Sequence, residues 1–490
     1  MAFTKRGSTS VFLTLIFASL IIVASVLIRA AGLSAGRSYG DAVFNMAGRS
    51  LLSEYDQKLF EDYGIFGMRS DEEDARRKLL HYSDASLERR TGMGGAVWVL
   101  PCSVRDLTTD LNEFSLLDVD VFEKQILGDA KNIIVNRAAD MLLSGSGGSG
   151  ASAGGASGSG GSGGSAGGAS GSGGSGASAG GAAGSEGAGD SAAGPRGVVG
   201  ELGNGAIINA LPSQGVSGGG LPIQTMIDNG LPSAEELLGS GSDTLLVTEY
   251  LLSRFTCAKT PVPKLASDHS HFFANEVEYI IAGEHSDSKN YSSVKTRLAL
   301  LRFVMNEIHI HSNSEKMNTV TSIQTALSAV VPPPWPQVLR ELIIALWVTA
   351  ETDNDMELLA RGRRVPLVKS KENWACGAGG IAEKVLAHIN ATGPGRPNAE
   401  EAPPPEPIAP EKEEGFLYVD YLRLFLYFVP RDVKLLRTMD LIQLNLKSSY
   451  YDSFLIRDHY TGIRYSLYMN GDRFEYTHTY AKQDGSEGHE

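Results

Sequence analysis

The sequence has few cysteines, and fewer basic than acidic residues. Its three cysteines, Cys102, Cys257 and Cys376, are too few for a disulfide-stapled scaffold or for a zinc site made of four thiolates. Its formal net charge is −14, which argues against non-specific nucleic-acid binding, because such binding needs a basic surface. Of its 490 residues, 42% are hydrophobic and 20% are charged, so we expect two to four folded domains and no wholesale disorder.

An uncharged apolar run extends from Val11 to Ile28. As a helix it would be about 27 Å long, close to the roughly 30 Å thickness of a bilayer's hydrocarbon core. Lys5 and Arg6 precede it, which favours a cytoplasmic N-terminus and an extracytoplasmic remainder. We therefore expect a single-pass anchor in the cell membrane, over residues 11–28 within a segment 1–32. The alternative is a secretory signal peptide cleaved at the small residues of 30–36.

The apolar run continues into an amphipathic pattern, which predicts one unbroken helix over residues 9–60. The residues that recur at spacings of three and four are Tyr39, Val43, Met46, Ala47, Leu51, Tyr55 and Leu59. A short basic leader, an apolar stretch and a long amphipathic helix resemble the N-terminus of type IV pilins and pseudopilins. In that pattern a glycine ends the leader and a glutamate lies five residues after the cut. Gly7 before Ser8 fits this pattern, but Phe12 takes the place of the glutamate, so cleavage by a prepilin peptidase is left open.

The segment SEYDQKLFEDYGIFGM at residues 53–68 resembles an uncharacterised bacterial family of membrane-anchored proteins that is associated with tight-adherence (Tad) pilus assembly. The resemblance continues in patches over most of the chain outside the linkers: residues 115–127, 245–255, 275–290, 363–374 and 418–446. It implies a membrane-anchored protein, and it carries over no catalytic residue or cofactor.

Composition divides the rest of the chain. We expect an ectodomain in two folded parts, 33–143 and 243–390, separated by a linker at 144–242 that begins with a Gly, Ser and Ala tract. A second linker, rich in Pro and Glu, covers 391–414; helices and a β-hairpin cover 415–480, and a polar tail covers 481–490. The fold class is α+β, with a helical ectodomain and a small C-terminal antiparallel sheet.

Periodicity predicts the main elements. We expect helices at 119–143, 294–310, 416–428 and 432–447, with a further helix after Pro336. A strand is expected at 96–104. Alternating side chains on both sides of Asn470-Gly471 predict a β-hairpin over 462–480, because this pair readily adopts a type I′ turn. Residues 450–457 could add a third strand to it.

Candidate chemistry is sparse. The Gly145-x-Gly147-x-x-Gly150 string matches a dinucleotide fingerprint, but a helix precedes it and a Gly/Ser tract follows, so it predicts no site. Asp268, His269 and His271 are the best metal candidates by ligand type, although spacing fixes no third ligand and a solvated polar loop is the better explanation. We therefore expect no catalytic, cofactor or metal site.

Two further sets of residues have ordinary explanations. Cys257 and Cys376 either pair with each other or are buried thiols. His309 and His311 end a predicted helix, where cationic side chains favour the helix dipole.

These observations favour a non-enzymatic structural or assembly component of a Tad-type pilus or a related secretion system. Its expected partners are membrane lipid, other membrane subunits of that system and a prepilin peptidase, with no nucleic acid. Two alternatives stay open: a membrane-tethered adhesion or binding module, and a tethered hydrolase whose site residues are dispersed in the sequence.

Overall fold

The computed structural model describes residues 6–88, 104–144, 211–213, 242–259, 271–331, 335–391, 407–469 and 471–480. The described helices are α1 (Arg6–Leu52), α2 (Gln57–Tyr63), α3 (Glu72–Glu88), α4 (Val119–Ser144), α7 (Ser242–Arg254), α8 (Glu276–Ala282), α9 (Asp287–Ser312), α10 (Ser314–Ser328), α11 (Leu339–Ala360), α12 (Ile381–Ala391), α13 (Tyr418–Phe428) and α14 (Arg431–Ser449). The described strands are β1 (Met68–Arg69), β2 (Val104–Asp110), β3 (His459–Tyr460), β4 (Gly462–Met469) and β5 (Asp472–Thr479). Short 3-10 turns are η1 (Asn112–Phe114), η5 (Trp335–Gln337) and η6 (Ile456–Asp458).

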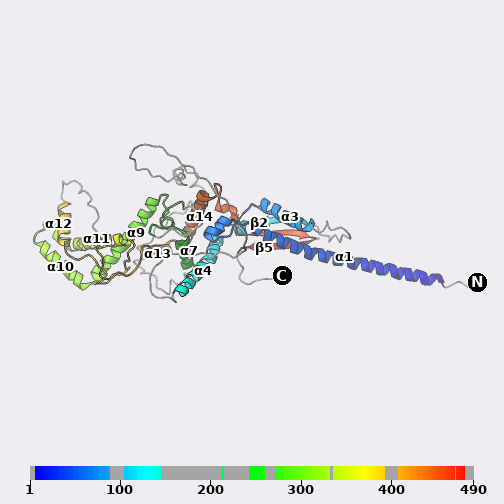
Figure 1. Cartoon of the computed structure of the whole chain (residues 1–490), viewed down its shortest axis with the longest axis horizontal. Coiled ribbons are helices and arrows are strands. Elements are labelled where there is room, and N and C mark those ends of the chain that lie inside the picture. Colours follow the sequence, from blue (N-terminus) through cyan, green and yellow to red (C-terminus); the bar gives the residue numbers. More distant parts are fainter. Residues whose placement is uncertain are drawn as a thin grey trace, which may run out of the picture.

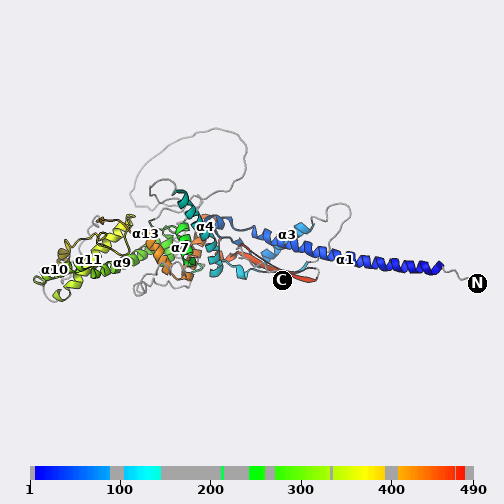
Figure 2. The same cartoon turned by 90° about the horizontal axis from the view of Figure 1, so that it is seen from below.

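The molecule is elongated, with the first turns of α1 at one extremity and helices α10, α11 and α12 at the other (Figure 1). The same order holds in the perpendicular view (Figure 2). The predicted α+β class, with a long apolar N-terminal helix and a small C-terminal antiparallel sheet, is confirmed.

The predicted hairpin is also confirmed: β4 pairs with β5 so that Met469 faces Asp472, and Gly471 has φ 99° in the turn. The third strand is not residues 450–457, and that expectation is wrong. Those residues form a turn and the start of η6, and the third strand is β2, which pairs antiparallel with β4. The sheet order is β2-β4-β5, so strands more than 350 residues apart in sequence lie side by side.

The prediction of an unbroken helix to residue 60 is wrong, because α1 ends at Leu52. Tyr55 forms an isolated β-bridge with Met68, which takes the backbone out of helical geometry. The Asp56 carboxylate then caps a new helix by accepting a hydrogen bond from the Leu59 N–H at 2.9 Å. Gly64, at φ 67°, ends this helix in the left-handed conformation that glycine adopts without strain.

Three hydrophobic cores follow one another along the molecule. A sheet core joins the second half of α1 and α3 to the three-stranded sheet; its members include Phe44, Leu51, Leu79, Ile463 and Leu467. A central core joins α2, α4, α7, α8, α13 and α14, and includes Phe122, Tyr250, Ile280, Phe425 and Ile442. A distal core joins α10, α11, α12 and the end of α9, and includes Ile310, Val320, Ile343, Trp347 and Val385.

The central core is built from both sides of the Gly/Ser/Ala tract, since Leu59 to Ala130 and Val247 to Ile456 contribute to the same cluster. Residues 407–414, at the end of the Pro- and Glu-rich segment, lie against the folded part. Ile408 exchanges two hydrogen bonds with the Asn354 side chain on α11, at 2.7 and 3.0 Å. The predicted strand at 96–104 lies outside the described residues except for Val104, where β2 begins.

Candidate functional site

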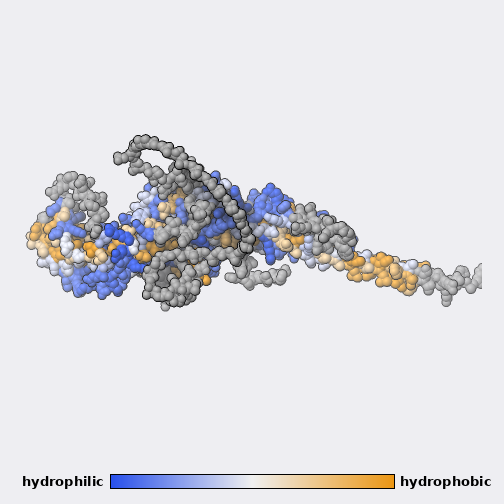
Figure 3. Space-filling model, viewed as in Figure 1, coloured by the Kyte–Doolittle hydropathy of each residue, from blue (hydrophilic) through white to orange (hydrophobic). Residues whose placement is uncertain are grey.

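The first half of α1 exposes its apolar side chains, which are between 41% and 67% exposed from Val11 to Ile28. Its hydroxyl groups are satisfied within the helix: Thr14, Ser19 and Ser25 donate to the carbonyl oxygens three residues earlier, at 2.8–2.9 Å. No side chain of this stretch therefore needs water as a partner. This part of α1 forms the apolar end of the molecule (Figure 3). It is long and apolar enough to cross a membrane, and no other helix among the described residues passes that test.

The second half of α1 is fastened to the sheet. Its buried face consists of Val43, Phe44, Ala47 and Leu51. The Tyr465 hydroxyl donates to the Phe44 carbonyl oxygen at 2.6 Å, and the Tyr476 hydroxyl donates to Asp41 at 2.8 Å. Gly48 permits the close approach, because a Cβ atom there would lie 2.7 Å from the Tyr465 Oη. One helix thus has an exposed apolar half and a half that is locked into a folded body.

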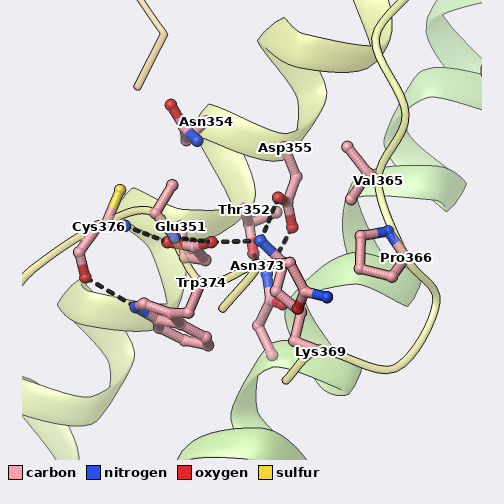
Figure 4. A network of polar contacts seen from close by, with 12 residues as sticks. Glu351, Thr352, Asn354, Asp355, Val365, Pro366, Lys369, Asn373, Trp374 and Cys376 are labelled. Carbon is pink, nitrogen blue, oxygen red and sulfur yellow. Dashed lines mark hydrogen bonds and ion pairs between the residues drawn. The ribbon is translucent and has the colours of Figure 1, made fainter. Parts of the chain in front are cut away.

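A second candidate is a buried polar network between α9, α11 and the loop that follows α11 (Figure 4). Arg302, fully buried, donates to Asp355 Oδ2 through Nε at 3.1 Å and Nη2 at 2.9 Å. Its Nη1 donates to the carbonyl oxygens of Pro366 and Leu367, each at 2.8 Å. The Lys369 ammonium donates to Asp355 Oδ1 at 2.6 Å and also contacts Glu351.

Glu351 holds the other end of this loop. Its carboxylate accepts backbone N–H bonds from Ala375 at 3.0 Å and Cys376 at 2.6 Å. Burial, followed by the charge of Glu351, raises the pKa of the Cys376 thiol to about 12, so the thiolate is scarce at neutral pH. Glu351 and Asp355 of α11 both have hydrogen-bond partners within the protein, and the network fixes the loop that follows α11 in place.

The end of α9 differs from the expectation that His309 and His311 are cationic side chains at a helix C-terminus. His309 is buried, and its ring stacks on Trp374 with a centroid distance of 5.1 Å. Burial, helped by the charge of Lys316, lowers the pKa of His309 and favours the neutral imidazole. The Lys316 ammonium lies 3.9 Å from the centre of the Trp374 ring and 4.9 Å from that of Trp347. His309 therefore belongs to the distal core, while His311 is exposed.

The metal candidates are only partly described. Asp268 and His269 lie outside the described residues. The His271 Nδ1 atom lies 2.8 Å from Glu276 Oε2, which also accepts from the Thr256 N–H and hydroxyl at 2.9 and 3.1 Å. Glu276 Oε1 accepts from Asn445 at 2.6 Å. Within the described ranges, no group of three or more His, Cys, Asp or Glu residues could hold a metal ion.

The described part of the chain also has an open cleft of about 490 Å³ at the start of α3. Its lining residues are Arg69, Ser70, Asp71, Asp74, Arg77, Asp458 and Tyr460, with no histidine or cysteine among them. Asp74 pairs with Arg77 at 2.6 Å and with Lys78 at 2.9 Å. The Ser70 hydroxyl donates to Asp74 Oδ2 at 3.3 Å, but the hydrogen bonds from Lys78 and Arg77 lower the pKa of Asp74, so this carboxylate is a weak base.

Comparison with known protein families identifies a family for this chain. The model of DUF5702, a family of unknown function, matches residues 208–471, more than half of the chain. The chain belongs to DUF5702. Neither the curated proteins nor the solved structures contain a match to it.

The DUF5702 match starts after α4 and ends in the turn between β4 and β5. It includes the buried polar network and the distal core, and it leaves α1 outside. The two halves of α1 are therefore features of this chain that the family description does not cover. Gly7 and Ser8, the predicted leader boundary, lie in the first turn of α1, within a helix that begins at Arg6.

Sequence reasoning missed Arg302, Glu351 and Asp355. A signal was present, because Glu351 and Asp355 follow Trp347 and Val348 on one helical face at spacings of three and four. Charged residues on an otherwise apolar face are expected to be paired. Their partners could not be read, since Arg302 lies about 50 residues earlier and Lys369 lies in a loop.

Cys257 and Cys376, the pair left open by sequence, are not joined to each other. Cys257 is in the central core and Cys376 packs against the distal core.

Proposed function

We propose that this DUF5702 protein is a membrane-anchored, non-enzymatic structural component of an envelope assembly, with a Tad-type pilus or a related secretion system as the specific candidate. The observation that carries the proposal is the division of α1 into an exposed apolar half and a half packed on the antiparallel sheet. The apolar half would lie in the cell membrane with a cytoplasmic N-terminus, and the sheet and helical cores would lie outside. Two resemblances support a Tad-type pilus as the assembly: the N-terminal segment resembles pilins, and residues 53–68 resemble Tad-associated proteins.

In such an assembly α1 would act by packing against neighbouring membrane helices. Association in lipid depends on small residues that let helix backbones approach closely. Ala18 and Ser25 lie seven residues apart, which places them on one face of α1, while Leu20 and Leu27 lie on the opposite face. The Ser25 hydroxyl already donates to the Ile22 carbonyl at 2.8 Å, so this face carries no unsatisfied donor.

Cysteine cross-linking in native membranes tests this role. Ala18→Cys and Ser25→Cys should give oxidative cross-links to partner subunits that also carry single cysteines, whereas Leu20→Cys and Leu27→Cys should give few. The wild-type chain controls for its own cysteines. Equal cross-linking from both faces would contradict specific packing, and wild-type pilus assembly after deletion of the gene would contradict the assembly role.

The anchor itself has a separate test. The full chain should stay with membranes through alkaline carbonate extraction, and N-terminal sequencing should recover a chain that still contains residues 11–28. A first residue at Ser8 would support processing by a prepilin peptidase, whereas a first residue near Leu33 would remove the anchor and refute the proposal.

One observation favours a second candidate, the tethered adhesion module. Val330, just after α10, is 73% exposed, and Val338, just before α11, is 47% exposed. Helices α10 and α11 lie at the opposite end of the molecule from the apolar half of α1 (Figure 1). An adhesion role predicts that Val330→Asp/Val338→Asp reduces binding of cells to surfaces and leaves pilus assembly unchanged.

A further inference from the structure

The β4–β5 hairpin points toward the apolar half of α1. Arg37 of α1 pairs with Asp472 at 2.7 Å, and Asp41 accepts from Tyr476 at 2.8 Å, while Leu52 contacts Tyr480 at the far end of α1. Strand β5 therefore runs parallel to α1, and the turn at Gly471 lies on the side of the membrane-spanning residues. The sheet lies alongside the second half of α1 in both views (Figures 1 and 2).

The distance from this turn to a membrane is short. Arg37 lies nine residues beyond Ile28, which is about 13 Å along a helix. The headgroup layer takes up roughly 5–8 Å of that length. The remaining gap is at most about one Debye length at physiological ionic strength, roughly 8 Å, so charges at the turn act on the lipid surface.

The second row of the sheet, counted from the turn, has the composition that such a surface attracts; the first row is Val104, Met469 and Asp472. Arg105, Tyr468 and Arg473 lie directly opposite one another across β2, β4 and β5, so they share one face of the sheet. Tyr468 is 44% exposed, the Arg473 side chain is 60% exposed, and Arg105 is exposed as well. Arginine and tyrosine are the side chains enriched where proteins meet lipid headgroups.

The row itself carries two arginines and no carboxylate, in a chain of net charge −14. The acidic residues near this end include Asp41, Asp106 and Asp472; Asp41 accepts from Tyr476, and Asp472 pairs with Arg37. Glu475, one step further along β5, lies 3.9 Å from Arg473. A row with two cationic side chains and an exposed tyrosine favours an anionic partner at this end.

We propose that the Arg105–Tyr468–Arg473 row docks on the anionic headgroups of the membrane that α1 spans. The inference rests on the membrane anchor of the proposed function and adds a second contact to it. A single helix leaves the body above it free to tilt, whereas a helix and a docked sheet edge fix its direction relative to the bilayer.

Photolabelling of the full chain in nanodiscs tests the docking. The discs contain phosphatidylcholine with a quarter phosphatidylglycerol, and each preparation carries a phospholipid with a diazirine either in the acyl chain or in the headgroup. Mass spectrometry should find acyl-chain labels within residues 11–28 and headgroup labels on the peptide that contains Tyr468 and Arg473. Arg105→Glu/Arg473→Glu should lower the headgroup labelling of that peptide by roughly threefold or more.

The matched control is Arg457→Glu, which makes the same charge reversal as each of the two substitutions, at a side chain that is 63% exposed near the far end of the sheet. It should leave the labelling unchanged, and discs without phosphatidylglycerol should lower it in the wild-type chain. Acyl-chain labelling of α1 without headgroup labelling of the hairpin would overturn the docking and leave the proposed function intact. Absence of acyl-chain labels from α1 would overturn both.

Discussion

Replacing Arg302 by methionine should destabilise the protein far more than its loss of volume explains. The change leaves the buried carboxylate of Asp355 facing only Lys369 and Asn306, and leaves the carbonyl oxygens of Pro366 and Leu367 without the Arg302 donor. Removing one partner of a buried ion pair costs about 3–5 kcal/mol, because the other charge stays buried and undercompensated. At roughly 2.1 cal/mol/K per residue, a chain of this size has an unfolding entropy of about 0.7–1 kcal/mol/K, so we expect the melting temperature to fall by roughly 3–7 °C.

Thermal unfolding of the full chain in detergent, followed by tryptophan fluorescence, measures this effect, since Trp347 and Trp374 lie in the distal core next to the network. The matched control is Arg297→Met on the same helix, because Arg297 is half-buried and donates to the Ile281 carbonyl at 3.2 Å. That variant should lose about 1 kcal/mol, the net value of an ordinary hydrogen bond.

A double variant separates charge from packing. In Arg302→Met/Asp355→Leu the uncompensated carboxylate is gone, so this protein should be more stable than Arg302→Met alone. The reasoning is refuted if Arg302→Met costs no more than Arg297→Met, or if the double variant is the less stable of the two.

Three further outcomes are expected. Gly48→Ala should destabilise the packing of α1 on the sheet by about 1–3 kcal/mol, because the added methyl meets Tyr465 and His478, and urea unfolding measures it. Burial lowers the pKa of His478 below its usual 6.5, so the unfolded chain binds the proton before the folded chain does as the pH falls. The free energy of unfolding should therefore decrease below about pH 6.5. Unfolding measured across a pH series should show a smaller decrease in His478→Phe. Cys376 should resist iodoacetamide at pH 8 until the protein unfolds, because its raised pKa of about 12 keeps the thiol protonated, and mass spectrometry of the alkylated peptide checks this.

Local signals predicted the elements whose structure is set locally. Asn470-Gly471 with alternating side chains on both sides predicted the β4–β5 hairpin, and apolar spacing predicted α4, α13 and α14 close to their observed bounds. The same spacing predicted α9 but missed its first two turns, Asp287 to Ser293. The end of α1 was mispredicted because Tyr55 and Leu59 continue the helical spacing, whereas the bridge to Met68 and the Asp56 cap, which break the helix, depend on the tertiary fold.

Long-range pairings could not be predicted. Thr108 meets Ser466 across 358 residues of chain, and no property of either strand specifies the other. The packing of α1 on the sheet could not be predicted either, although the apolar face formed by Val43, Ala47 and Leu51 indicated that another element would cover it. Of the two halves of α1, the sequence therefore predicted the apolar membrane-spanning half, and it did not predict that the other half packs on a sheet.

The pairing of β2 with β4 sets an order of events during synthesis. At about 5–20 residues per second, the ribosome needs roughly 20–70 s to proceed from the end of β2 to the end of β5. Throughout that time Phe44 and Leu51 have no strand to cover them, although α1 has already emerged. The nascent chain would therefore wait tens of seconds before β4 and β5 can complete the cover over this apolar face of α1.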